Sequence, residues 1–316
     1  MLLEGAVALT GTIVPLVTPF EAEEFDAQAM DQLIGWVLEQ GADALMPTAL
    51  TGEGPLLTGE ETVAVWAAVF ELAAGRTPVV PAVISATTRE ASYLVRIAEG
   101  MGAAAVMVAP VLPELYAGRS HDDVWAFYAE VASATSLPII LFNYPSLTGV
   151  DFTLPLVARL LEIENVRYIK ESSGDTKRVH GLQRGLGDRL TVICGTPNTA
   201  LESLALGCRV WITGIMNAVP RSARQLMAAV QMGDLGLARR IYYRQVLPLV
   251  DVLAANYNPT GTIKAAVRAR GVHVGVPRRP GSDVSQADWQ HLNELVADIA
   301  RAEEQAALHL QQRTAN

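Results

Sequence analysis

The feature that most constrains the fold is a regular alternation of short apolar runs, rich in Val and Ile, with longer stretches of helical periodicity. Eight apolar runs occur before residue 214, and each is followed by an amphipathic stretch. Consecutive βα units with short connections predict parallel strands, each covered by the helix that follows it. Eight is the number that closes a barrel, so the pattern predicts a (β/α)8 barrel. The expected strands span residues 12–17, 44–47, 78–84, 105–109, 138–142, 167–170, 191–194 and 210–213.

The helical periodicity is clear where Leu201, Leu204 and Ala205 place apolar side chains at positions i, i+3 and i+4. The main alternative to a barrel is a doubly wound open sheet. Against it, no glycine-rich phosphate-binding loop follows the first apolar run. The expected helices of the repeat span residues 27–39, 59–74, 90–101, 122–134, 154–161, 177–186, 198–206 and 220–230.

Beyond about residue 233 the strand signals stop, and three helical stretches are expected at residues 235–254, 262–269 and 285–309. Pro277 and Pro280 interrupt the pattern within residues 271–281, which we expect to form an irregular connector against the barrel. The chain is therefore predicted to consist of a barrel domain, residues 1–232, and a helical extension packed on it, residues 233–316.

Charge and cysteine content exclude several classes of function. The formal net charge is −9 and no run of Lys or Arg occurs, so neither nucleic acid nor an anionic membrane surface is an expected partner. Residues 1–18 resemble neither a secretory signal nor a membrane span, which favours a cytoplasmic protein. Cys194 and Cys208 are too few for a disulfide framework and lack metal-ligand spacing, so we expect two reduced cysteines and no metal site.

The sixth apolar run ends in Lys170, one of only three lysines beside twenty-one arginines. A lysine at the carboxyl end of a buried strand can lose its hydration, which lowers its pKa and frees the amine to attack a carbonyl carbon. Arginine cannot form an imine. Taken without the rest of the chain, this run fits a lysine that extends to the surface equally well.

Catalytic groups of a barrel lie where its strands end, and this rule also selects residues 48–54, 110–116 and 143–146. In the first of these segments, Thr51 and Gly52 could present a hydroxyl and backbone N–H groups to a substrate carboxylate. The alternative is that this segment is an ordinary cap for the helix that begins near residue 59.

Together these segments resemble the dihydrodipicolinate synthase / N-acetylneuraminate lyase family of class I aldolases, which form a Schiff base. The resemblance implies a barrel with three C-terminal helices, commonly assembled as a homotetramer or otherwise a dimer. It also implies an imine between Lys170 and the keto carbon of pyruvate or another 2-oxo acid, with no cofactor and no metal. Gly195 and Ile212 correspond to pocket positions of relatives. The matching segments are residues 11–20, 51–54, 143–149, 168–171, 214–220 and 258–259.

The chain departs from the family at three positions. Phe142 stands where the family has a tyrosine at the end of the fifth strand, and a phenyl ring cannot transfer a proton. Leu50 replaces a hydroxyl residue of the second-strand motif. Leu147 stands where synthases of dihydrodipicolinate have an arginine for the carboxylate of the aldehyde substrate. Tyr144 or Tyr116 could carry the proton instead, or a substrate group or water could supply it. Tyr116 is one of two positions at which a further family tyrosine could fall.

The sequence thus predicts a carbon–carbon or carbon–oxygen lyase that acts on a 2-oxo acid through Lys170. Leu50, Phe142 and Leu147 would make its pocket more apolar than usual, which suits an aliphatic or aromatic aldehyde as the partner. Two alternatives stay open. One is a 4-hydroxy-tetrahydrodipicolinate synthase, and the other is a barrel that binds a 2-oxo acid without turnover, as a sensor or a partner subunit.

Overall fold

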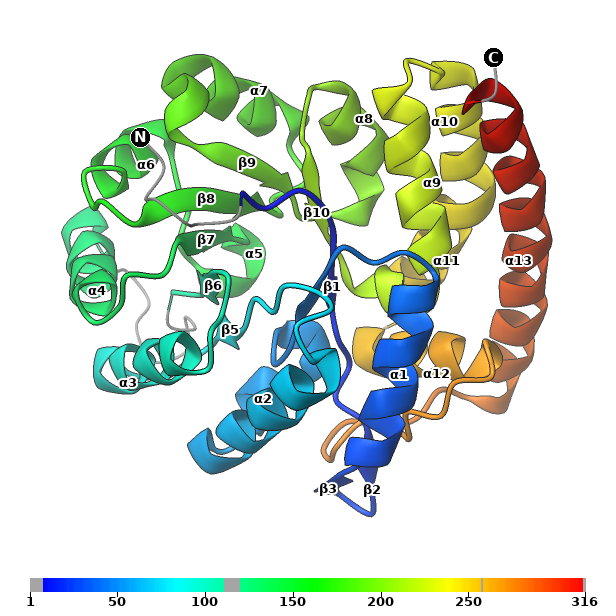
Figure 1. The fold of residues 1–316 in the computed structure, drawn as a ribbon, viewed down its shortest axis with the longest axis horizontal. Coiled ribbons are helices and arrows are strands. Elements are labelled where there is room, and N and C mark those ends of the chain that lie inside the picture. Colours follow the sequence, from blue (N-terminus) through cyan, green and yellow to red (C-terminus); the bar gives the residue numbers. More distant parts are fainter. Residues whose placement is uncertain (1–7, 111–119, 257, 315–316) are drawn as a thin grey trace.

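The computed structural model describes residues 8–110, 120–256 and 258–314. Eight parallel strands form one sheet in the order β4-β1-β10-β9-β8-β7-β6-β5 (Figure 1). The two ends of this order meet, because Leu45 N–H donates to Pro78 O at 3.0 Å and Val80 N–H donates to Leu45 O at 2.8 Å. The predicted barrel is therefore confirmed, and the open sheet is excluded. The strands are β1 (Gly11–Pro15), β4 (Ala44–Met46), β5 (Ala82–Val83), β6 (Val106–Val108), β7 (Ile139–Asn143), β8 (Val166–Glu171), β9 (Thr191–Cys194) and β10 (Val210–Ile212).

Every predicted strand region contains a strand, although β5 is shorter than expected. Pro78 and Pro81 lie in that segment and cannot donate to a sheet ladder, which leaves two residues of regular strand. Three short elements were not predicted: the hairpin strands β2 (Phe20–Glu21) and β3 (Glu24–Phe25), and the one-turn helix α5 (Pro145–Thr148). They are too short to produce a detectable period.

Five of the eight barrel helices begin after a residue whose side chain accepts from a free backbone N–H group. Asp26, Thr87 and Asp175 accept from the first turns of their helices, and Thr58 forms a capping box with Glu61. The eight barrel helices are α1 (Ala27–Glu39), α2 (Gly59–Ala73), α3 (Thr88–Gly100), α4 (His121–Ser133), α6 (Leu154–Leu160), α7 (Thr176–Leu186), α8 (Ala200–Ala205) and α9 (Pro220–Gln231).

Strand alternation divides the apolar side chains into two groups. In β7, Ile140 and Phe142 point into the barrel, whereas Ile139 and Leu141 pack against the helices. The interior group also includes Ile13, Met46, Met107, Tyr168, Ile193 and Ile212. The barrel is thus a packed core, and space for a ligand is confined to its ends.

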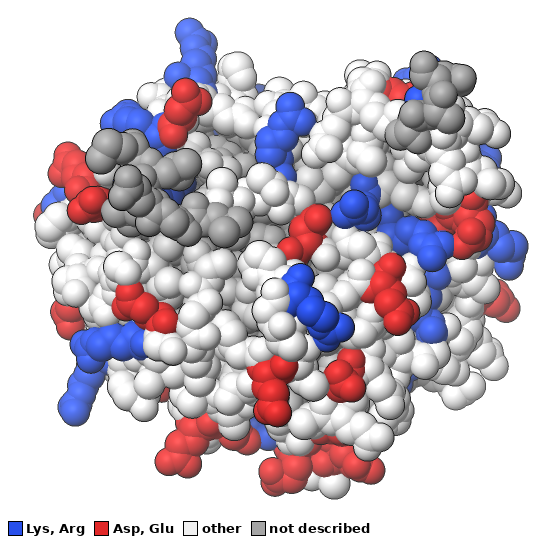
Figure 2. All heavy atoms as spheres, viewed as in Figure 1, with Lys and Arg blue, Asp and Glu red and all other residues white. Residues whose placement is uncertain are grey.

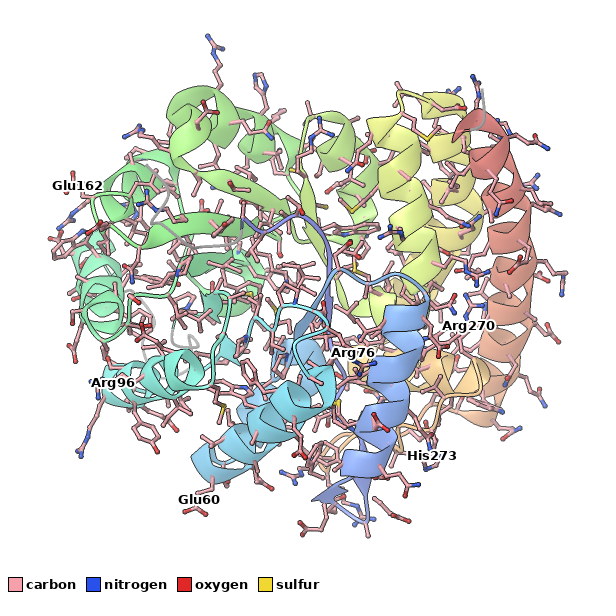
Figure 3. The ribbon with its side chains drawn as sticks, viewed as in Figure 1. Glu60, Arg76, Arg96, Glu162, Arg270 and His273 are labelled. Atoms are coloured by element: carbon pink, nitrogen blue, oxygen red, sulfur yellow. The ribbon has the colours of Figure 1, made fainter. Side chains whose placement is uncertain are left out.

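The helical extension comprises α10 (Leu235–Ile241), a π-helical segment (Tyr242–Val246), α11 (Leu247–Ala255), α12 (Pro259–Ala269) and α13 (Gln286–Thr314). In Figure 1, α13 runs along the outer side of α9 and α10. Arg270, labelled between α1 and α13 in Figure 3, pairs with Glu303 at 2.7 Å, and both side chains are buried. The predicted extension is confirmed, with a π-helical segment inside its first helical stretch. The domain boundary near residue 233 stays a prediction.

The irregular connector after α12 lies against the barrel, as predicted. Gly275 forms a bridge with Phe20 of β2, and a Cβ on Gly275 would lie 2.0 Å from Phe20 O. The Arg278 guanidinium donates to Glu61 Oε1 at 2.7 Å and lies 4.5 Å from the centre of the Phe20 ring. The connector therefore joins the extension to the N-terminal part of the barrel.

Figure 2 shows basic and acidic side chains intermingled over one face, with acidic groups gathered along the lower edge, where Figure 1 places β2, β3 and α2. Within the three described ranges, no helix is both long enough and apolar enough to cross a lipid bilayer.

Candidate active site

A cavity of about 260 Å³ lies where the barrel strands end. Larger hollows of about 450 and 430 Å³ are lined by residues that precede the strands, such as Asn165 and Thr10, and neither contains a lysine. Catalytic groups of such barrels lie at the carboxyl ends of the strands, so we take the smaller cavity as the site. It is lined by Leu50, Thr51, Phe142, Tyr144, Lys170, Ser172, Gly195, Thr196, Pro197, Asn198, Thr213, Gly214, Ile215, Leu253, Pro259 and Ile263.

Lys170 reaches this cavity because β8 alternates. Tyr168 and Lys170 point into the barrel, and Glu171 points toward the helices. Lys170 is buried and is the one charged side chain among the described residues that line the cavity. Burial lowers its pKa from 10.5 to about 8, which the neighbouring Cys194 opposes slightly. The amine is therefore far more nucleophilic near neutral pH than an exposed lysine.

The other two lysines cannot play this part. Lys177 is exposed at the start of α7, outside the cavity. Lys264 is fully buried in α12, and its Nζ lies 2.6 Å from Glu53 Oε1. Only Lys170 combines burial with access to the cavity.

The segment after β4 folds into a tight turn next to Lys170. Thr48 and Glu53 have left-handed φ angles of 58° and 57°, and the 3-10 turn Leu50–Gly52 lies between them. The Gly52 N–H is engaged in this turn, donating to Ala49 O at 2.9 Å. The N–H and hydroxyl of Thr51 make no hydrogen bond to any described residue. Thr51, rather than Gly52, thus has free donors for a ligand.

The alternative role of this segment as a helix cap is wrong. The Thr58 side chain caps α2, accepting from Glu61 N–H at 3.2 Å, while Glu61 Oε2 accepts from Thr58 N–H at 2.8 Å. Thr51 therefore does not cap α2.

Two aromatic residues form one wall. The Phe142 ring centre lies 4.9 Å from Lys170 Nζ, close enough for a cation–π contact. Tyr144 packs edge-on against Phe142 at 6.0 Å and lines the cavity. Tyr116, the other candidate proton carrier, lies outside the described residues. Tyr144 is thus the one candidate carrier whose position can be stated.

Leu147 and Ile212 do not line the cavity. Leu147, in α5, packs on the interior apolar group, and Ile212 is fully buried within that group. Both therefore lie beneath or beside the cavity, where they affect its shape through packing. Leu50 and Gly195 line it directly.

Ser172 was missed from the sequence. Its Oγ is buried and has no hydrogen-bond partner in the described part of the chain. A Cβ on Gly195 would lie 2.1 Å from this oxygen, so the glycine leaves the space that Ser172 occupies. The signal was available, because Ser172 lies two residues after Lys170 and strand alternation places both on one face.

Leu253 and Ile263 were also missed, and no local signal could have found them, whereas Pro259 belongs to a segment that matched the family but was not assigned to the pocket. They come from α11 and α12, in the helical extension, and line the cavity together with residues of the barrel. The extension is therefore part of the cavity wall.

Hydrogen bonds fix the segments around the cavity. Asn143 Nδ2 donates to Glu171 Oε2 at 2.6 Å, and Ser173 N–H donates to Glu171 Oε1 at 2.7 Å, which ties β7 to β8. Burial raises the pKa of Glu171. From the π-helical segment, Tyr242 donates its hydroxyl to Asn198 O at 2.5 Å and so holds the loop after β9.

Cys194 and Cys208 are free and buried, as expected, and burial raises the pKa of both thiols. A search of the described residues finds no cluster of His, Cys, Asp and Glu side chains arranged to hold a metal ion. Among these residues the reactive group that faces the cavity is an amine.

Comparison with known proteins gives consistent matches over most of the chain. The model of the Dihydrodipicolinate synthetase family matches residues 8–299. A 4-hydroxy-tetrahydrodipicolinate synthase from Thermomicrobium roseum is 33% identical, over 90% of this chain and 92% of the relative. The structure resembles dihydrodipicolinate synthase from Aquifex aeolicus (TM-score 0.85, 31% identity, 92% and 97% of the two chains). It also resembles a chloride-inhibited dihydrodipicolinate synthase from Acinetobacter baumannii complexed with pyruvate (TM-score 0.86, 28% identity, 93% and 99%).

Proposed function

This chain belongs to the dihydrodipicolinate synthetase family of class I aldolases, and from that premise we propose that Lys170 forms an imine with the keto carbon of pyruvate or another 2-oxo acid. The observation on which this depends is the position of Lys170. Of three lysines in the chain, it alone is buried, has no carboxylate partner among the described residues and is open to the cavity at the strand ends.

The reaction follows from the chemistry of a desolvated amine. The neutral Lys170 nitrogen attacks the keto carbon, and the resulting carbinolamine loses water to give a protonated imine. The imine nitrogen withdraws electrons, so a C–C or C–H bond one carbon away can break and leave an enamine. In the reverse direction, the enamine carbon adds to an aldehyde. The Phe142 ring, 4.9 Å from Nζ, would favour the cationic forms along this route.

The carboxylate of the 2-oxo acid would be bound by Thr51. Its hydroxyl and N–H have no partner among the described residues, and both belong to a turn that Gly52 and Glu53 hold in a fixed shape. Binding at Thr51 would orient the keto carbon toward Lys170, which lines the same cavity.

Proton transfer must follow an altered route, since Phe142 has no hydroxyl. Tyr144 is the carrier that we propose, because it lines the cavity and packs on Phe142. Tyr116 is the other candidate from the sequence. General acid–base help is worth roughly 10²–10⁴-fold, so loss of the working carrier should slow turnover by that factor.

The second substrate that the cavity favours is an apolar aldehyde. Leu50, Phe142, Leu253 and Ile263 supply apolar wall, and Lys170 is the one cationic side chain on the described lining. The names of the relatives support a second candidate, 4-hydroxy-tetrahydrodipicolinate synthase. Against it, Lys170 is the one cation on the described lining, and Leu147 beside the cavity supplies no second charge for the carboxylate of a semialdehyde.

A barrel that binds a 2-oxo acid without turnover is the third candidate. Trapping of an adduct tests whether the protein forms an imine at all. Incubation with pyruvate and cyanoborohydride should add a reduced pyruvyl group to Lys170, detected by peptide mass spectrometry. Lys170→Met should abolish the adduct, and Lys177→Met should leave it unchanged. An absence of adduct with every member of a panel of 2-oxo acids would refute the proposal.

The aldehyde is tested by turnover. Pyruvate consumption with propanal, benzaldehyde and aspartate semialdehyde should be fastest with the apolar aldehydes, and Leu147→Arg should shift the preference toward aspartate semialdehyde. Phe142→Tyr should change the rate of the proton-transfer steps. An adduct without turnover of any aldehyde would favour the binding protein. We also propose that the protein is a homo-oligomer, either a dimer or a tetramer, and that it is located in the cytoplasm.

A further inference from the structure

A buried ion pair joins the helical extension to the turn that contains Thr51. Lys264 Nζ lies 2.6 Å from Glu53 Oε1 and donates to Val276 O at 3.0 Å. The other oxygen, Glu53 Oε2, accepts from the Arg278 N–H at 2.8 Å. The two paired side chains are 0% and 4% exposed, so both charges lie outside water. Glu53 is thus held from two sides by residues that follow it far along the chain.

The buried Glu53–Lys264 pair is not explained by a contribution to stability alone. Removing two charges from water costs free energy that their attraction barely offsets, and apolar side chains of similar volume often serve as well. Burial also lowers the pKa of Lys264, which the attraction of Glu53 opposes. The contacts of Lys264 and Arg278 with Glu53, called the clamp below, can also fix the backbone. Glu53 has the left-handed φ of 57° that shapes the turn after β4.

The clamp lies directly behind two walls of the cavity. Thr51 and Ile263, which line the cavity, are close sequence neighbours of Glu53 and Lys264. Both walls meet at Gly214, where an added Cβ would lie 2.7 Å from Thr51 Oγ1 and 2.9 Å from Ile263 Cδ1. A displacement of Glu53 or Lys264 would therefore move Thr51 relative to the cavity.

The turn has little freedom to absorb such a displacement elsewhere. A Cβ on Gly52 would lie 2.6 Å from Leu16 O, and Thr18 Oγ1 donates to Gly52 O at 2.6 Å. Gly52, between Thr51 and Glu53, is thus packed against the residues that follow β1, while Glu53 is held by the extension and the connector after α12.

We infer that Glu53 and Lys264 are positioning residues, which hold the Thr51 hydroxyl and N–H where they bind the carboxylate of the 2-oxo acid. This role rests on the proposed function. It assigns to the helical extension an indirect part in substrate binding, exerted through Thr51, since Lys264 belongs to α12.

The test measures the pyruvate concentration that gives half-maximal trapping of the Lys170 adduct. Glu53→Gln keeps an acceptor for the Arg278 N–H but removes the charge that holds Lys264. We expect the half-maximal concentration to rise about tenfold, as for loss of one hydrogen bond to a charged group. The pH midpoint of Lys170 modification should stay unchanged, because neither residue of the pair contacts Lys170.

A double-mutant cycle separates positioning from general loosening. Thr51→Val removes the hydroxyl and should also raise the half-maximal concentration about tenfold. If Glu53 acts through Thr51, the double variant Thr51→Val/Glu53→Gln should differ from Thr51→Val by less than about threefold, since coupled sites are not additive. Two independent effects would multiply to about a hundredfold, and that result would overturn the inference.

Two further variants control for folding. Glu303→Gln breaks the buried pair with Arg270, away from the cavity, and should lower Tm without changing the pyruvate dependence. Glu53→Gln/Lys264→Met leaves no unpaired buried charge, so it should fold even if a single variant does not, and it should still show weakened pyruvate binding. Folded variants of the Glu53–Lys264 pair with wild-type pyruvate dependence would refute the positioning role alone. If the wild-type protein forms no adduct, the proposed function fails and the positioning role fails with it.

Discussion

The reactivity of Lys170 should depend on pH in a way that burial sets. Burial lowers its pKa from 10.5 to about 8. At pH 7 the neutral fraction of the amine then rises from about 0.03% to about 9%, roughly 300-fold. Because the neutral amine is the nucleophile, its modification rate should rise about tenfold per pH unit below pH 7 and level off above about pH 8.

This dependence is measured by brief acetylation with acetic anhydride between pH 6 and pH 11, followed by peptide mass spectrometry. Lys177 lies exposed in the same chain, so its modification gives an internal reference for the reagent. A matched variant, Phe142→Leu, removes the ring whose centre lies 4.9 Å from Nζ. Since that ring stabilises the ammonium, the midpoint should fall, by up to about one pH unit.

Two results would refute this reasoning. A midpoint near pH 10.5 would mean that burial does not remove the hydration of Lys170. A midpoint that rises in Phe142→Leu would mean that the ring does not favour the charged amine, and that its role in the cavity is packing alone.

Other expectations concern stability and the shape of the cavity. Lys170→Met removes a buried charge that has no carboxylate partner in the described part of the chain, so the free energy of unfolding in urea at pH 7 should rise by about 3 kcal/mol. The gain should vanish as pH rises from about 8 to 10.5, and an equal gain at all pH values would contradict its cause. Gly195→Ala adds a Cβ 2.1 Å from Ser172 Oγ, so adduct trapping should slow at least about tenfold, and an unchanged rate would show that Ser172 can move freely. Glu303→Gln leaves Arg270 buried and unpaired, which should lower the calorimetric free energy of unfolding by about 3 kcal/mol; no loss would mean that the pair contributes nothing.

Local periodicity explains why so much of the barrel could be predicted. The apolar runs at residues 139–143 and 166–170 contain side chains that alternate between the barrel interior and the helix layer, and this alternation needs only neighbouring residues. Lys170 was selected because it ends an apolar run and Phe142 because of the family resemblance, whereas alternation from Lys170 could have placed Ser172. Periodicity did not predict the strands of the β2–β3 hairpin, because each contains only two residues.

The sequence by itself predicted the class of fold and selected Lys170, because strand and helix periodicity depends on neighbouring residues and only three lysines occur in the chain. Only the tertiary structure decided which Thr51 donors are free, that α11 and α12 complete the cavity wall, and that Glu53 pairs with Lys264. These features depend on contacts between segments far apart in the sequence. Their geometry is fixed by how the extension packs on the barrel, and no local pattern records that packing.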